Sequence, residues 1–135
     1  MRTLKLIPRD QQGSAAVEFA LAVPILILFI WGILQVGLLF QANAGMQHAL
    51  GEGARAATLC VPAGNVCTVP SDTTIKSKMT EKLFGQSDGT FTVQDPTTSA
   101  GYKTLTITYT RNMNFLFFNG PSVTLTRTKQ VYTVA

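Results

Sequence analysis

An uncharged apolar stretch near the N-terminus constrains the fold of this chain more than any other feature. Asp, Glu, Lys and Arg are absent between Phe19 and Gly51, and the first part of this stretch, Phe19 to Phe40, is almost wholly apolar. About 20 apolar residues are enough to cross a lipid bilayer as a helix. The sequence therefore predicts a membrane-spanning helix at about residues 19–40.

The residues before this stretch predict the orientation of the helix in the membrane. Arg2, Lys5 and Arg9 outnumber Asp10, so the N-terminal segment carries a net positive charge. Positively charged segments beside a membrane helix remain on the cytoplasmic side. We therefore expect a single-pass protein of the inner (cytoplasmic) membrane, with its C-terminal domain periplasmic or extracellular.

A single carboxylate lies where the apolar stretch begins. Glu18 would face lipid there, and an ionisable group at such a place is a functional candidate because exposing it to hydrocarbon is costly. A Gly13–Ser14 bond precedes it by a few residues. This order suggests a precursor that is cut at the Gly–Ser bond, so that its new N-terminal amine can pair with a carboxylate.

The segment from Gly13 to Pro24, GSAAVEFALAVP, resembles the start of a type IV prepilin, and most closely that of the TadE-like pseudopilins of the Flp/Tad pilus system. In that group a prepilin peptidase cuts after a Gly, and a Glu lies five residues into the mature chain. Gly13 and Ser14 match the cleavage pair, and Glu18 matches the acid. Weaker similarity continues at residues 51–57 and 109–128, and the same residues also fit the relative TadF and other minor pilins.

The resemblance implies a minor pilin or pseudopilin that a prepilin peptidase processes and that takes part in assembling a Tad/Flp pilus. Its partners would be the peptidase, other pilin and pseudopilin subunits, the Tad assembly platform and membrane lipid. In an assembling filament, the Glu18 carboxylate would meet the Ser14 ammonium of a neighbouring subunit. Residues 1–13 would be a cleaved basic leader, residues 14–59 a long helix, and residues 60–135 a small extracytoplasmic domain.

Helix-forming residues continue well beyond the membrane segment. From Ser14 to Leu59 the chain would form a rod of roughly 70 Å at 1.5 Å per residue. Pro24 removes one backbone donor and crowds the preceding turn, so a kink or a loosened turn is expected there.

Small residues recur every four positions in the outer part of this helix, at Gly45, Ala49, Gly53 and Ala57. Such a ridge lets two helices approach closely. It fits two structures equally well, namely packing on the protein's own domain or a seam between neighbouring subunits. His48 lies beside this ridge, and we interpret it as an ordinary residue of the polar face.

The two cysteines predict a disulfide outside the cytoplasm. Cys60 and Cys67 follow the helix and would lie in an oxidising compartment. They close a short loop of turn-forming residues, and a bridge there would stabilise the domain by about 2.5 kcal/mol. Free thiols are the next alternative. A metal site is the weakest, because these cysteines and the distant His48 do not make a tetrahedral ligand set.

The C-terminal half predicts a small α+β domain. Ser71 or Asp72 can cap a short helix that runs to Phe84 and stops at Gly85. Three segments then alternate apolar and polar residues, around residues 91–93, 104–110 and 123–126, the last reaching toward residue 132. This alternation predicts a half-buried antiparallel sheet of three strands.

An apolar cluster interrupts these strands. Asn119-Gly120-Pro121 has the composition of a turn between the last two strands. Just before it, Phe115 to Phe118 are too apolar for an ordinary loop. We favour a flap that closes the core; the alternative is an exposed contact for a partner subunit.

Several function classes find no support in the sequence. Neither a nucleophile elbow, a phosphate loop nor a zinc motif occurs, so we expect neither an enzyme nor a cofactor. The net charge of +4 is too dispersed to predict nucleic-acid binding. Two alternatives to a pilin remain: an uncleaved, membrane-tethered periplasmic adaptor, and a secreted binding domain released by signal peptidase after Ala42-Asn43-Ala44. The apolar stretch is too long for a typical signal peptide, which disfavours the secreted domain.

Overall fold

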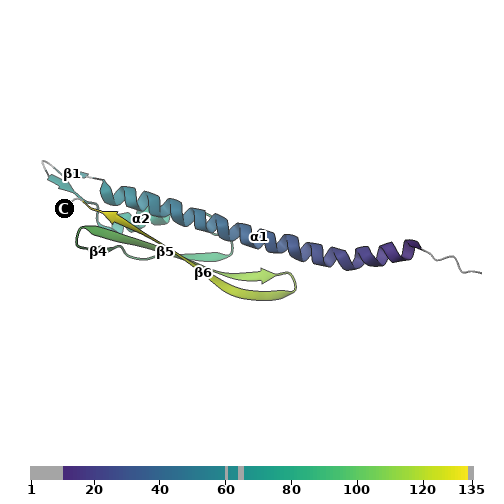
Figure 1. Ribbon diagram of the computed structural model, residues 1–135. Coiled ribbons are helices and arrows are strands. Elements are labelled where there is room, and N and C mark those ends of the chain that lie inside the picture. The colour runs from purple at the N-terminus through teal and green to yellow at the C-terminus, as the bar shows by residue number, and fades with distance from the viewer. Residues whose placement is uncertain (1–10, 60, 64–65, 134–135) are drawn as a thin grey trace, which may run out of the picture.

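One long helix lies along a small helix-and-sheet domain (Figure 1). The computed structural model describes the backbone of residues 11–59, 61–63 and 66–133 of the 135-residue chain. Helix α1 spans Gln11–Thr58, and its N-terminal part extends beyond the domain. The predicted fold class is confirmed: a long apolar helix and a short helix are followed by an antiparallel sheet, which together make an α+β protein.

Helix α1 continues without a break through Pro24. It ends at Thr58, whose hydroxyl donates to the carbonyl oxygens of Ala54 and Arg55, at 3.3 and 3.0 Å. Arg55 in the last turn interacts favourably with the negative end of the helix dipole. Two short strands follow, β1 (Val61–Ala63) and β2 (Val66–Thr68), which pair as a separate antiparallel ribbon.

The short helix α2 spans Asp72–Glu81. The Ser71 hydroxyl accepts a hydrogen bond from the Thr74 backbone N–H, as the sequence predicted for a cap. Helix α2 stops three residues before Phe84, and Gly85 then takes a left-handed φ of 82°. Because a helix period places them on one face, Ile75 and Met79 are both fully buried.

The main sheet has four antiparallel strands: β3 (Gly89–Val93), β4 (Thr97–Ser99), β5 (Tyr102–Phe115) and β6 (Phe118–Tyr132). Strand β5 is central and pairs with β6 along one edge. Strands β3 and β4 share its other edge. The sequence predicted three of these strands and missed β4, which is only three residues long.

The turn between β5 and β6 differs from the predicted one. The chain reverses at Leu116–Phe117, and Asn119-Gly120-Pro121 lies inside β6. Phe115 and Phe118 flank the turn with stacked rings, 4.8 Å between centroids, which holds the hairpin closed. A register shift follows between Asn112 and Asn114, and Pro121 is tolerated because β6 is an edge strand.

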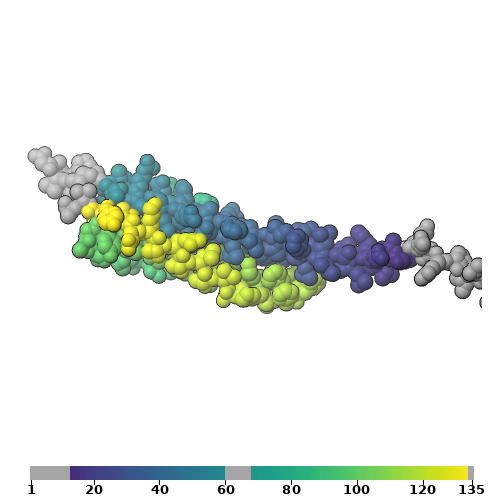
Figure 2. Space-filling view, viewed as in Figure 1, coloured from purple at the N-terminus to yellow at the C-terminus, as the bar shows by residue number. Residues whose placement is uncertain are grey.

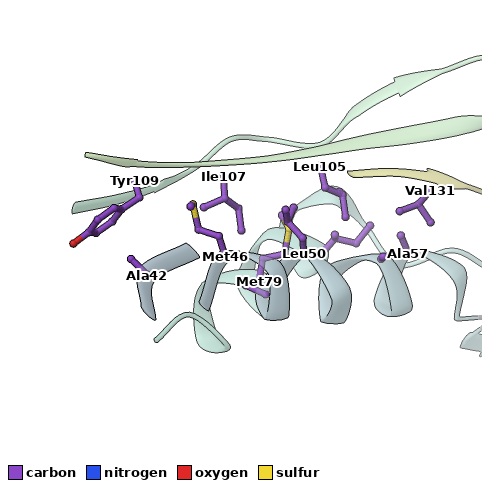
Figure 3. Packing of buried hydrophobic residues seen from close by; sticks show 12 residues of the cluster. Ala42, Met46, Leu50, Ala57, Met79, Leu105, Ile107, Tyr109 and Val131 are labelled. Atoms are coloured by element: carbon purple, nitrogen blue, oxygen red, sulfur yellow. The ribbon is translucent and has the colours of Figure 1, made fainter. Parts of the chain in front are cut away.

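The core lies between the helices and one face of the sheet (Figure 3). Alternation along β5 places every second residue on this face. On the opposite face, threonines of β5 and β6 face one another with hydroxyl oxygens 3.3–3.4 Å apart. The buried apolar residues are Ala42, Met46, Ala49, Leu50, Ala54 and Ala57 of α1, Ile75 and Met79 of α2, Leu105, Ile107 and Tyr109 of β5, and Val131 of β6.

Candidate functional site

The N-terminal part of α1 extends beyond the domain (Figure 2), and its apolar side chains are largely exposed. Val17, Phe19 and Leu21 are 60–71% exposed, and apolar side chains point outward on all sides of the helix. A helix that is apolar all round is stable only when something apolar surrounds it. Within the described residues, α1 is the one helix long and apolar enough to cross a membrane.

The three residues predicted for processing and assembly lie at the start of this exposed segment. Gly13, Ser14 and Glu18 are all exposed, and a Cβ added at Gly13 would meet nothing within 4 Å. Ser14 and Glu18 are one turn apart, so they share a helix face. Glu18 has no hydrogen bond or ion pair to any residue that the structure describes. Its carboxylate is therefore open to a partner from outside this chain.

The small-residue ridge faces the protein's own domain. Ala49 and Ala57 are fully buried. A Cβ at Gly45 would lie 2.1 Å from the Phe84 carbonyl oxygen, and one at Gly53 would lie 2.4 Å from Met79 Cγ. The ridge thus lets α1 contact α2 and the turn after it. A subunit seam along these four residues would require the domain to open.

The remaining candidates are peripheral. His48 is exposed, with Nδ1 3.4 Å from the Lys82 carbonyl oxygen and its ring edge-on to Phe84. Pro24 lies on the free part of α1, four residues before the first turn that the hairpin reaches. Cys60 and the Cys67 side chain lie outside the described residues, so their disulfide stays a prediction.

A clamp between α1 and the β5–β6 hairpin was not predicted from the sequence. Trp31 Nε1 and Gln35 Nε2 both donate to the Asn114 carbonyl oxygen, each at 2.9 Å. Gln35 is 4% exposed. The only local signal was that Gln35 is a polar residue inside an otherwise apolar stretch. Its acceptor is 79 residues further along the chain, so the sequence around Gln35 could not predict it.

Beside this clamp, the hairpin and α1 form an open apolar groove next to the turn of the hairpin. The end of the hairpin therefore lies along the apolar stretch of α1 and does not cover the core. The groove is lined by Leu28, Phe29, Gly32, Ile33 and Val36 of α1 and by Met113 and Phe115 of β5.

Apart from the Glu52–Arg55 pair on α1, the ion pairs that the structure describes lie in the helix-and-sheet domain. Lys103 pairs with Asp72, Lys76 with Asp95 at 2.8 Å, and Arg111 with Asp88 at 3.8 Å. Lys78 and Lys82 beside Glu81 lower the pKa of that exposed carboxyl. No group of His, Cys, Asp or Glu among the described residues could hold a metal ion. These contacts join α2 and β5 to each other and to the residues that flank β3, without forming a reactive centre.

The structure thus combines one exposed apolar helix, long enough to cross a membrane, with a small helix-and-sheet domain. The family model of TadE-like protein matches residues 13–55, a segment that lies entirely within α1. Residues 13–55 thus carry a TadE-like protein family domain. Members of this family are generally pilus components rather than enzymes. Neither the curated proteins nor the solved structures compared with the chain include a match.

Proposed function

We propose that this protein is a minor pilin or pseudopilin that a prepilin peptidase cuts between Gly13 and Ser14 and that takes part in assembling a Tad/Flp pilus. One observation carries the proposal. The Gly13–Ser14 bond and Glu18 are exposed at the end of α1 farthest from the domain, inside the TadE-like segment.

Before assembly, α1 anchors the protein in the cytoplasmic membrane, and lipid covers the apolar surface around Phe19 and Leu21. The basic leader stays in the cytoplasm, where the peptidase reaches the Gly13–Ser14 bond. Each Å² of apolar surface that lipid removes from water contributes about 25 cal/mol, so the membrane-spanning position of α1 is strongly favourable. The small domain then lies on the opposite side of the membrane.

Cleavage creates a new charge at the end of the helix. The α-amino group of Ser14 becomes an ammonium, one turn from Glu18 of the same chain. In a bundle of helices, Glu18 meets the Ser14 ammonium of a neighbouring subunit. A pair of this kind offsets part of the desolvation cost of both charges, whereas an unpaired buried charge is heavily penalised. It therefore sets the register at which a new subunit docks.

Partners follow from this mechanism. The peptidase contacts the leader, other pilin and pseudopilin subunits contact α1, and the Tad assembly platform receives the membrane-inserted subunit. Seams between subunits are formed by the outward apolar residues of α1, such as Leu26, Ile30 and Phe40, which are 50–69% exposed. The ridge at Gly45 is covered by the protein's own domain and takes no part in these seams.

The two alternatives differ in the N-terminus of the mature chain. An uncleaved adaptor keeps Met1. A secreted domain begins at Gly45, but cutting there would divide α1 and remove Ala42, which is fully buried in the core. Intact mass of protein recovered from the envelope separates the three. A chain beginning at Ser14 supports the proposal, and one beginning at Met1 or Gly45 contradicts it.

The role of Glu18 is tested by cross-linking in cells. Glu18→Gln keeps the shape of the side chain but removes its charge, so insertion and cleavage should be normal while cross-linking to other pilus subunits decreases. Glu52→Gln is the matched control, because Glu52 lies on the same helix beside the domain and only 3.9 Å from Arg55. Equal cross-linking and piliation of wild type and Glu18→Gln would remove the assembly role.

A further inference from the structure

The tip of the β5–β6 hairpin has no role in the core. Leu116, Phe117 and Phe118 are 51%, 74% and 57% exposed, so the interpretation as a flap that closes the core is wrong. Moreover, residues 112–126 contain no charged side chain. An exposed, uncharged, aromatic end of a hairpin is unusual on a surface that faces water.

The tip lies at the level of the apolar stretch of α1 (Figures 1 and 2). Phe115 lines the groove together with Leu28 and Phe29 of α1. The hydrogen bonds from Trp31 and Gln35 to the Asn114 carbonyl oxygen fix this level. The hairpin end therefore reaches the same depth as residues 28–35 of α1.

Membrane thickness places that level at the outer boundary of the bilayer. A hydrocarbon core of about 30 Å needs about 20 helical residues, which from Ser14 reach Ile33. Trp31 is then at the outer interface, the layer that tryptophan prefers. With a span at residues 19–40, the tip would lie deeper still.

Polar groups on the hairpin distinguish the two positions of the tip, at the outer interface or deeper in the hydrocarbon core. The side chains of Asn112 and Asn119 are exposed, and the outer edge of β6 is unpaired within the described sheet. Open sheet edges are not tolerated in hydrocarbon but are tolerated among hydrated headgroups. The interface satisfies both the aromatic rings and the polar backbone, so the shallower position is favoured.

We propose that the tip of the β5–β6 hairpin, Phe115 to Phe118, inserts into the outer interfacial layer of the membrane as a second anchor beside α1. Lipid acyl chains fill the groove between the tip and α1. This inference rests on the proposed function in one respect: α1 must span the membrane. The domain is thereby held against the bilayer at a fixed tilt until the subunit leaves the membrane.

Tryptophan fluorescence can test this in the full-length chain, because Trp31 is its only tryptophan. In a Trp31→Phe background, Gln35 keeps its hydrogen bond to the hairpin. Phe117→Trp is the reporter, and Phe118→Trp a second one in case the first disturbs the turn. Each protein is reconstituted at low density in phosphatidylcholine vesicles whose acyl chains carry bromine either near the headgroup or near the chain end.

Two further variants calibrate the measurement. Ile25→Trp reports the middle of the span, since Ile25 is 69% exposed on the free part of α1. Ser99→Trp reports the opposite end of the domain, on the exposed strand β4. We expect Phe117→Trp to be quenched at least threefold more than Ser99→Trp, and more by bromine near the headgroup than near the chain end. Ile25→Trp should show the reverse preference for bromine depth.

The outcomes separate this inference from the proposed function. If Ile25→Trp is quenched while both hairpin reporters behave like Ser99→Trp, α1 spans the membrane and the second anchor is refuted. Blue-shifted but unquenched hairpin reporters would mean that the tip is buried against protein, either the same chain or a second copy, and would equally overturn the inference. If Ile25→Trp itself is unquenched, α1 does not span the bilayer, and the proposed function fails as well.

Discussion

Replacing glycines of α1 by alanine tests how closely the helix approaches its own domain. At Gly51 an added Cβ meets nothing within 4 Å. At Gly45 it would lie 2.1 Å from the Phe84 carbonyl oxygen, a backbone atom that cannot rotate away. Each change replaces a glycine in the helix interior by alanine, so each variant gains the same helix-propensity contribution to stability, roughly 1 kcal/mol.

The difference between the two variants therefore isolates the steric term. Overpacking a close contact typically costs about 1–3 kcal/mol. Gly51→Ala should raise the free energy of unfolding, whereas Gly45→Ala should lie about 1–3 kcal/mol below it. Gly53→Ala should fall between them, because its Cβ would meet the flexible side chain of Met79.

Thermal unfolding of the full-length protein in detergent micelles measures this, followed by near-ultraviolet circular dichroism of the domain tyrosines. For a domain of about 100 residues, 1 kcal/mol shifts Tm by roughly 4 °C or more. We therefore expect Gly45→Ala to melt at least about 4 °C below Gly51→Ala. Equal melting temperatures would mean that α1 does not contact the turn after α2 as described.

Three further predictions concern processing, the core and the cysteines. Gly13→Val should leave the leader attached while membrane insertion proceeds, and a mass that still shows the cut at residue 13 would refute the site. Burial raises the pKa of Tyr109 above its ordinary value of 10.0. The neutral phenol therefore stabilises the fold below about pH 10, and this contribution is lost as the pH rises through the higher pKa of the folded state. Tyr109→Phe loses the hydrogen bond to the Ser87 carbonyl oxygen and should lower the free energy of unfolding at neutral pH by about 1 kcal/mol. Urea unfolding should show that this difference between variant and wild type becomes smaller above pH 10. A difference that does not change with pH would contradict the assignment. If Cys60 and Cys67 are bridged, reduction should add about 2 mass units and lower the free energy of unfolding by about 2.5 kcal/mol; thiol labelling without reductant would disprove the bridge.

Features encoded by neighbouring residues could be predicted from the sequence. The long helix follows from uninterrupted helix-forming residues, and the Ser71 cap from a hydroxyl before a helical pattern. Strands β3, β5 and β6 follow from alternation with a period of two. Each of these signals depends on residues within one turn or one strand, so no knowledge of distant contacts was needed.

Features decided by distant contacts could not be predicted in this way. The Asn119-Gly120-Pro121 signal for a turn was overridden by stacking of Phe115 on Phe118, and Gly120 packs so closely on Phe115 that an added Cβ would lie 2.8 Å from its ring. The helix period showed that small residues share one face, but not which surface covers them. The covering surface is formed by α2 and the turn after it, whose position relative to α1 the local sequence pattern does not give.

The clamp at Trp31 and Gln35 has a mechanical consequence. The domain holds α1 at two separated levels, through the core around Met46 and through the Asn114 carbonyl oxygen near the hairpin tip. Two attachment points separated along α1 prevent the domain from tilting away from the helix, so a pull on the domain moves it and the attached part of α1 as one rigid body. Bending is thereby concentrated in the free segment before Leu28, which contains Pro24.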